Sequence, residues 1–171
     1  HHEIEILTLD KYGFTFRATK KKLGQDEIYD AFVISAEDDE TLKFVNEEMI
    51  PDLEKERELR LCIPIRDFPV GNETMVKMIE QNIHKSLSVI VLLNNQLKEN
   101  IWADYIMQEA HLKKFDNREN FRIILVPIIP VNDLNIKSRL IKAYMRTTTY
   151  ISSHELMFWQ RLSYAIQFGK K

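Results

Sequence analysis

The sequence predicts an α/β protein in which helices cover both faces of a parallel sheet. Beyond residue 28, short apolar runs alternate with longer amphipathic stretches, and this alternation repeats five times. The run at 87–93 is almost unbroken in its apolarity, which is typical of a strand buried on both faces. Strict alternation and right-handed crossovers favour a flavodoxin-like, three-layer fold with a five-stranded parallel sheet in the order 2-1-3-4-5.

The expected strands are short runs rich in branched and aromatic residues, at 29–34, 59–63, 87–93, 122–126 and 147–151. The expected helices show apolar residues at helical spacing, and they lie at about 37–53, 75–83, 101–114, 136–144 and 158–166. Acidic residues at 37–40 suit the start of the first helix, because carboxylates complement its positive dipole end. Pro51 falls inside that helix and predicts a kink or a broken last turn.

Residues 1–28 differ from the rest, so we expect an N-terminal segment at 1–28 and a folded domain at 29–171. The leading pair His1-His2 resembles a purification-tag remnant. Alternating aromatic residues at 12–16 precede the basic cluster at 20–22. This pattern fits an edge strand or a tail packed on the domain, and it equally fits a juxtamembrane segment, since basic residues collect on the cytoplasmic side of a membrane span. The chain contains no run of about 18 apolar residues, so its sequence predicts no membrane span within it.

Composition excludes several classes of function. Only 4 of the 171 residues are glycine, and Gly71 is the single one within 29–168. Phosphate-binding loops need several glycines close together, so neither a Rossmann site nor a P-loop is expected. The balance of 24 Lys+Arg against 26 Asp+Glu lacks the concentrated basic face of a duplex nucleic-acid binder. One cysteine, Cys62, cannot form an internal disulfide, which favours a reducing compartment.

Three stretches in order carry a resemblance to a known family. They are YDAFVIS at 29–35, LCIPIRDFPVGN at 61–72 and MFWQRL at 157–162. They resemble box 1, box 2 and box 3 of the Toll/interleukin-1 receptor (TIR) domain family, and within it the cytoplasmic domain of animal Toll-like receptors. The residues that carry boxes 1 and 3 are Tyr29, Asp30, Ala31, Phe32, Phe158 and Trp159. The resemblance covers about residues 28–168.

The loop after the second expected strand is the candidate interaction site. Two prolines reduce its freedom, so that less entropy is lost when it docks. An apolar tip flanked by charges suits a protein contact, and the resemblance implies that this loop binds partners. Alternatively, Phe68 and Val70 fold back on the core while Arg66 and Asp67 pair locally. Gly71 is expected to turn the backbone at positive φ. The residues of the site are Ile65, Arg66, Asp67, Phe68, Pro69, Val70, Gly71 and Asn72.

One position of this loop departs from the family pattern. Val70 stands directly before Gly71, where the common pattern of the family has proline, and Pro69 comes one residue earlier. Adaptor contacts that depend on the proline therefore do not carry over automatically to this chain.

The resemblance implies a signalling domain of innate immunity on the cytoplasmic side of the plasma or endosomal membrane, in a parent protein anchored to that membrane. Such a domain associates weakly with itself, as a homodimer or a higher assembly, and recruits TIR-containing adaptor proteins. We expect no cofactor, no metal and no nucleic-acid partner. The TIR domain of a cytosolic adaptor, or of an interleukin-1-type receptor, would look much the same.

An enzyme is the main alternative, because some TIR domains cleave NAD. Their catalytic glutamate lies on the third helix, four residues after a tryptophan. Four residues after Trp102 this chain has Ile106, which can act neither as acid nor as base. Glu109 lies about one helical turn further on and would serve only a shifted substrate. We therefore expect no catalytic residue.

A phospho-acceptor receiver domain shares the same sheet order but needs an aspartate at the end of the third strand. Asp38 and Asp39 could supply its acidic pair, but that strand ends in Leu93 and Asn94. Three histidines lie on separate elements without the spacing of metal ligands, and Cys62 on an apolar strand is expected to be a buried, unreactive thiol.

Overall fold

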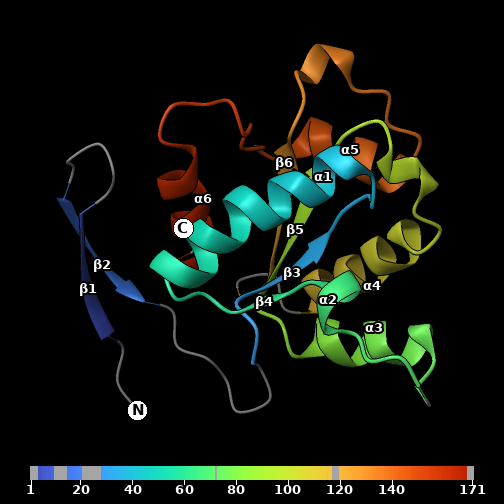
Figure 1. The fold of residues 1–171 in the computed structure, drawn as a ribbon, viewed down its shortest axis with the longest axis horizontal. Coiled ribbons are helices and arrows are strands. Elements are labelled where there is room, and N and C mark those ends of the chain that lie inside the picture. The colour runs from blue at the N-terminus through green and yellow to red at the C-terminus, as the bar shows by residue number, and fades with distance from the viewer. Residues whose placement is uncertain (1–3, 10–14, 21–27, 72, 117–119, 169–171) are drawn as a thin grey trace.

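A parallel sheet forms the middle layer of the computed structural model, which describes residues 4–9, 15–20, 28–71, 73–116 and 120–168 (Figure 1). Within this part of the chain the sheet has four strands in the order β4-β3-β5-β6. These are β3 (Ala31–Ile34), β4 (Leu61–Cys62), β5 (Ser88–Leu93) and β6 (Arg122–Pro127). β5 pairs with β6 along its whole length, and all three pairings are parallel. The predicted α/β class is confirmed.

The predicted fifth strand at 147–151 is not found as a strand. Ser138 caps the preceding helix by accepting a hydrogen bond from the Ile141 amide, so the helix starts later than expected and ends at Thr147. The Thr147 and Thr148 hydroxyls then bond back to helix carbonyls at 2.8 and 2.6 Å. Only a short extended segment remains beside β6, where the Ile151 amide donates to the Leu125 carbonyl at 2.9 Å.

Helices cover both faces of the sheet (Figure 1). One face carries α1 (Asp39–Phe44), its direct continuation η1 (Val45–Glu56), and α6 (Phe158–Phe168). The other carries α3 (Met75–His84), α4 (Ala103–Asp116) and α5 (Arg139–Thr147). The short turns are α2 (Pro64–Asp67), η2 (Leu97–Glu99) and η3 (Val131–Asp133).

The core is divided by the sheet into two clusters, as the alternation of side chains along a strand requires. Phe32, Val89 and Val91 point to the cluster beneath α3, α4 and α5. Val33 and Ile90 point to the cluster beneath α1, η1 and α6. All six residues of β5 are buried, as its apolar sequence predicted.

Pro51 does not end the helix that contains it. η1 is a π-helix whose turns are wider than those of an α-helix, and it continues to Glu56. In an α-helix the proline ring would collide with the carbonyl of Glu47, four residues earlier. The wider turns relieve that clash, so the predicted break is wrong, while Val45, Met49 and Leu53 still share the buried side.

The N-terminal segment contains a two-stranded antiparallel hairpin of β1 (Ile4–Leu9) and β2 (Thr15–Lys20). The hairpin is separate from the main sheet, and β2 lies beside α6 (Figure 1). The predicted aromatic positions 12 and 14 and the rest of the basic cluster at 21–22 fall outside the described residues. In the described part of the chain, no helix combines the length and the apolarity needed to cross a bilayer.

Candidate interaction site

The predicted interaction loop begins with the short helical turn α2, directly after β4 and Ile63. Pro64 occupies its first position, where its fixed φ fits a helix and the missing N–H has no partner to lose. The Ile63 amide donates to Asp67 Oδ2 at 2.8 Å, and the Asp67 amide donates back to the Ile63 carbonyl at 2.7 Å. These two bonds make the first half of the loop an ordered turn.

Arg66 ties this turn to helix η1. Its Nη1 and Nη2 atoms donate to the two carboxylate oxygens of Glu54 at 2.6 and 2.8 Å, and Nη2 also reaches the Leu61 carbonyl at 3.1 Å. Its Nε donates to Asp67 Oδ1 at 2.8 Å. Hydrogen bonds to Glu54 and Asp67 raise the pKa of the Arg66 guanidinium, so it stays charged. A paired fork of this kind adds geometric definition as well as energy.

The sequence alternative of local pairing is therefore correct for Arg66 and Asp67, but it is incomplete. It missed Glu54, the partner from η1, which is twelve residues away in the sequence. No local pattern marks such a partner, because the contact depends on how η1 packs beside β4.

Phe68 turns inward. Its ring lies edge-on to that of the fully buried Phe32, with centroids 6.0 Å apart and planes at 65°. It packs, half-buried, against the cluster beneath α3 and α4. The fold-back alternative is thus correct for Phe68, which anchors the loop from below and does not belong to its exposed part.

Val70 does the opposite and is fully exposed. Ile65 is 55% exposed, and Pro69 is exposed as well. We call Ile65, Pro69 and Val70 the exposed tip. Gly71, next in the chain, has φ +154°, a positive value that favours glycine, as predicted. Asn72, the last predicted site residue, lies outside the described residues.

The residues of box 1 and box 3 are placed in the interior. Asp30, only 3% exposed, accepts a hydrogen bond from the Arg60 amide at 2.8 Å and joins the strand edges through its own carbonyl, which accepts from Ser88. Phe158 and Trp159 pack on each other at the start of α6, and Trp159 stacks on Phe44 at 5.7 Å. The buried residues are Asp30, Ala31, Phe32, Phe158 and Trp159, while Tyr29 is half-buried and packs against the cluster that contains Phe32. Their positions support the fold.

At the position where NAD-cleaving TIR domains have their catalytic glutamate, this chain has a buried isoleucine, Ile106. Ile106 is 3% exposed and belongs to the core cluster beneath α4. Trp102, four residues earlier, lies edge-on to Tyr105 at 6.4 Å. Glu109 is half-buried, and burial followed by the charge of Glu80 raises its pKa. Glu109, the carboxylate one turn after Ile106 on α4, is therefore close to the carboxylate of Glu80 on α3.

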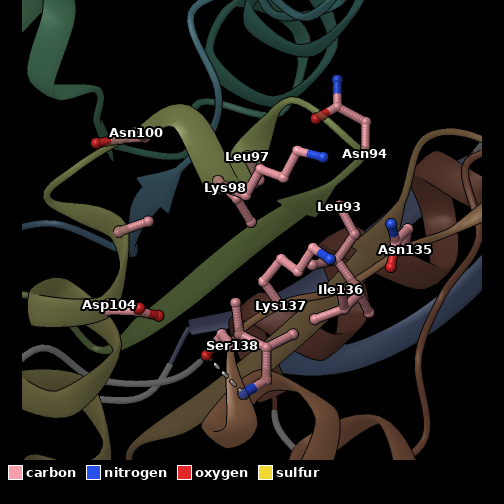
Figure 2. A pocket seen from close by; sticks show the side chains of 12 residues that line it. Leu93, Asn94, Leu97, Lys98, Asn100, Asp104, Asn135, Ile136, Lys137 and Ser138 are labelled. Atoms are coloured by element: carbon pink, nitrogen blue, oxygen red, sulfur yellow. Dashed lines mark hydrogen bonds between the residues drawn. The ribbon is translucent and has the colours of Figure 1, made fainter.

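A small cavity opens at the carboxyl end of β5, between the starts of α4 and α5 (Figure 2). Its volume is about 70 Å³, below the roughly 300 Å³ at which small-molecule sites begin. Asn94 lies at its rim where a receiver domain would need its aspartate, and its amide donates to Thr41 Oγ1 at 2.7 Å. An amide cannot accept a phosphoryl group. Among the described residues no group of three or more His, Cys, Asp or Glu side chains could hold a metal ion.

Comparison with known proteins gives concordant results. A family model described as TIR domain matches residues 28–169. Protein toll of Drosophila melanogaster is 27% identical over 149 residues, which is 86% of this chain and 13% of toll. Toll-like receptor 4 of Bos taurus is 30% identical over 180 residues, which is 98% of this chain and 21% of that receptor. This chain therefore spans about a fifth or less of the length of these relatives.

Solved structures agree on the fold. The TIR domain of the Toll-related receptor TRR-2 from Hydra magnipapillata aligns with a TM-score of 0.63 at 20% identity, covering 81% of this chain and 98% of that one. A metazoan TIR-STING receptor from C. gigas aligns with a TM-score of 0.59 at 21% identity, covering 86% and 42%. At these identities the likeness concerns the fold alone.

Proposed function

The chain belongs to the TIR domain family, and on that premise we propose that it is the signalling domain of a Toll-like receptor, which associates with other copies and recruits TIR-containing adaptors. The observation that carries the proposal is the exposed tip, in which Val70 is fully exposed and Ile65 is 55% exposed. Apolar side chains displayed on an anchored loop are the usual centre of a protein contact.

The anchoring is what makes the tip suitable for binding. Arg66 holds the turn to Glu54 of η1, and Phe68 holds it to Phe32 in the core. Because these contacts exist before any partner arrives, little conformational entropy is lost on docking. The tip then contributes apolar burial at its centre, while the charges of the turn stay paired within the molecule.

The place of this domain in the cell follows from the same premise. We propose that the parent protein is membrane-anchored and that this domain lies on the cytoplasmic side of the plasma or endosomal membrane. A cytosolic adaptor or an interleukin-1-type receptor could carry a similar TIR domain. The full-length sequence distinguishes these parents, since a receptor has an apolar span of about 20 residues upstream of the domain.

The recruitment proposal is tested with Val70→Asp. A buried, unpaired carboxylate in the middle of an apolar contact is costly, so capture of a TIR-containing adaptor by the immobilised domain should be lost. Because Val70 is fully exposed, the thermal midpoint should stay within a few degrees. The matched control is Leu156→Asp, at an apolar residue that is 75% exposed and precedes α6. Equal capture by the folded Val70→Asp variant and the original chain would refute the assignment.

We further propose that the domain acts as a scaffold and not as an NAD-cleaving enzyme. What supports this is the buried isoleucine at position 106, which leaves no acid or base there. The purified domain should release no nicotinamide when it is incubated with NAD. Glu109→Ala is the informative companion variant: release by the original chain that disappears in this variant would overturn the proposal.

A further inference from the structure

Helix α5 presents an unusually one-sided charge distribution. It contains no acidic residue, and its exposed cations Arg139, Lys142 and Arg146 follow spacings of three and four. That spacing places them on one face, opposite the buried Ile141 and Tyr144. Lys137, just before the helix, continues this surface toward the cavity shown in Figure 2, where Lys98 reaches the same space. We call Lys137, Arg139, Lys142 and Arg146 the basic face.

The four cations of the basic face have no close ion-pair partner among the described residues. All four are exposed. Because the formal net charge of the chain is −2, the rest of the chain carries an excess of negative charge.

That excess lies on the opposite helical layer. Exposed carboxylates line α1 and η1, where the only exposed cations are Lys43 and Lys55. We call Asp39, Glu40, Glu47, Glu48 and Glu56 the acidic face. These carboxylates differ from Asp52 and Glu54 of the same helix, which are already paired with Arg57 and Arg66.

The two faces cannot meet in one molecule. η1 packs on the core cluster that contains Val33, and α5 packs on the cluster that contains Phe32, so the sheet lies between them. Figure 1 shows α1 and its continuation crossing in front of the strands. Because they lie on opposite layers, direct pairing between these two faces requires a second molecule.

We propose that the basic face of one copy docks on the acidic face of a second copy. The contact joins two different surfaces, so the pair keeps one free acidic face and one free basic face, and the arrangement extends as a head-to-tail chain. This deepens the self-association in the proposed function and rests on it. The occupant is a second copy because this molecule itself carries the complementary surface; an anionic lipid surface is the competing occupant that the test must separate.

The first measurement is sedimentation velocity of the original chain at two ionic strengths. Association through exposed charges weakens as salt screens them. It should appear at about 10 mM salt, where the Debye length is about 30 Å, and disappear at about 150 mM salt, where the Debye length is about 8 Å. A sedimentation coefficient that does not change with concentration at low salt would overturn the proposal.

A charge swap identifies the two faces. Lys142→Glu with Arg146→Glu removes the net positive charge of the basic face, and Glu47→Lys with Glu48→Lys removes most of the negative charge of the acidic face, so each double variant alone should lose association at low salt. An equimolar mixture of the two should regain pairwise association, because the intact acidic face of the first variant can still meet the intact basic face of the second. A mixture that stays monomeric, or single variants that associate like the original chain, would refute the pairing of these faces.

Two controls test whether net charge alone, or binding to a lipid surface, explains the results. Lys77→Glu on α3 with Lys85→Glu, directly after that helix, lowers the net charge by the same amount as Lys142→Glu with Arg146→Glu and should leave association intact. If instead the original chain stays monomeric but binds phosphatidylserine vesicles, and Lys142→Glu with Arg146→Glu removes that binding, the basic face is a lipid site and the proposal is wrong. None of these experiments uses an adaptor or touches the exposed tip, so their failure leaves recruitment through Val70 to be judged separately.

Discussion

At the scale of single residues, Phe68 and Val70 divide the work of the loop between them. In a regular extended chain, residues two apart point to the same side. Here Phe68 contacts Phe32 in the core, while Val70 is fully exposed. The chain bends at Phe68 and again at Val70, and it leaves the loop through the positive φ of Gly71. One side chain fixes the position of the loop and the other remains available to a partner.

Phe68→Ala should therefore lower stability as well as binding. Removing a half-buried aromatic ring should cost about 2 kcal/mol of unfolding free energy, less than at a fully buried site. For a chain of this size that corresponds to a fall of about 4–8 °C in the thermal midpoint, measurable by calorimetry. Phe68→Leu, which keeps most of the apolar volume, should lose less than half as much. A midpoint for Phe68→Ala equal to that of the original chain would mean that the ring does not anchor the loop.

Gly71→Ala tests the backbone alone. A β-carbon at this position would meet no atom within 4 Å, so no steric clash is expected. The cost comes from holding alanine at φ +154°, and strain of this kind is about 1–3 kcal/mol. Urea denaturation should show it, with Val70→Ala next to it as a control that leaves the glycine in place. Identical urea midpoints for Gly71→Ala and the control would show that the turn tolerates an L-residue.

The sequence predicted part of this arrangement. The sequence predicted an apolar tip, and Ile65 and Val70 are exposed as that prediction requires. Whether Phe68 and Val70 turn inward was left open for both residues, since nothing in the local sequence distinguishes them, and the structure shows that only Phe68 does so. Glu54 was missed, because its contact with Arg66 joins residues that only the packed fold brings together. That the tip binds partners stays a prediction.

At the scale of elements, the strongest patterns were the most reliable. The apolar run of β5 fixed the centre of the sheet, since only burial on both faces suits such a sequence. The boundary between α5 and the expected fifth strand was wrong, because Ser138 caps the helix at a later start and the hydroxyls of Thr147 and Thr148 bond back to its last turn. Helix ends depend on such individual bonds, which composition and periodicity do not report.

The start of α1 offers a pH test of one such bond. Asp38 accepts hydrogen bonds from the Thr41 hydroxyl at 2.6 Å and, more weakly, from Asn94 at 3.3 Å. Burial alone would raise the pKa of Asp38, but these hydrogen bonds outweigh it and leave the pKa below its ordinary value of 3.8. A pKa that is lower in the folded state means that the carboxylate stabilises the fold above pH 3.8 and loses that effect as the pH falls through the folded pKa.

Asp38→Ala should therefore cost about 1 kcal/mol of unfolding free energy at neutral pH, the usual value of an N-cap. The difference from the original chain should shrink when denaturation is repeated below pH 3.8, because the original carboxyl is then losing its charge. Asp38→Asn, which caps without titrating, is the control and should stay parallel to Asp38→Ala across the pH range. A difference between the original chain and Asp38→Ala that is constant from neutral to acid pH would contradict the role assigned to the charge.

At the scale of the whole molecule, three kinds of surface lie on different elements of one scaffold. The exposed tip follows β4, the acidic face lies on α1 and η1, and the basic face lies on α5. The near-neutral total charge concealed this separation, because opposite faces cancel in a sum. A molecule arranged in this way can hold a neighbour through its charges while its tip remains free for an adaptor.

The contacts that follow from this arrangement are individually weak, and the isolated domain should therefore be mostly monomeric at micromolar concentration in physiological salt. Exposed ion pairs contribute about 1 kcal/mol or less each, and salt at about 150 mM screens them further. In a receptor, pairing of two tethered domains raises their effective concentration to about the millimolar range, which makes the same contacts sufficient. Sedimentation velocity at low micromolar concentration should show a single species of about 20 kDa, in line with the chain mass of 20.3 kDa. A stable dimer under those conditions would mean that the domain carries a larger and more apolar interface than the exposed tip and the charged faces supply, and that assembly does not depend on tethering.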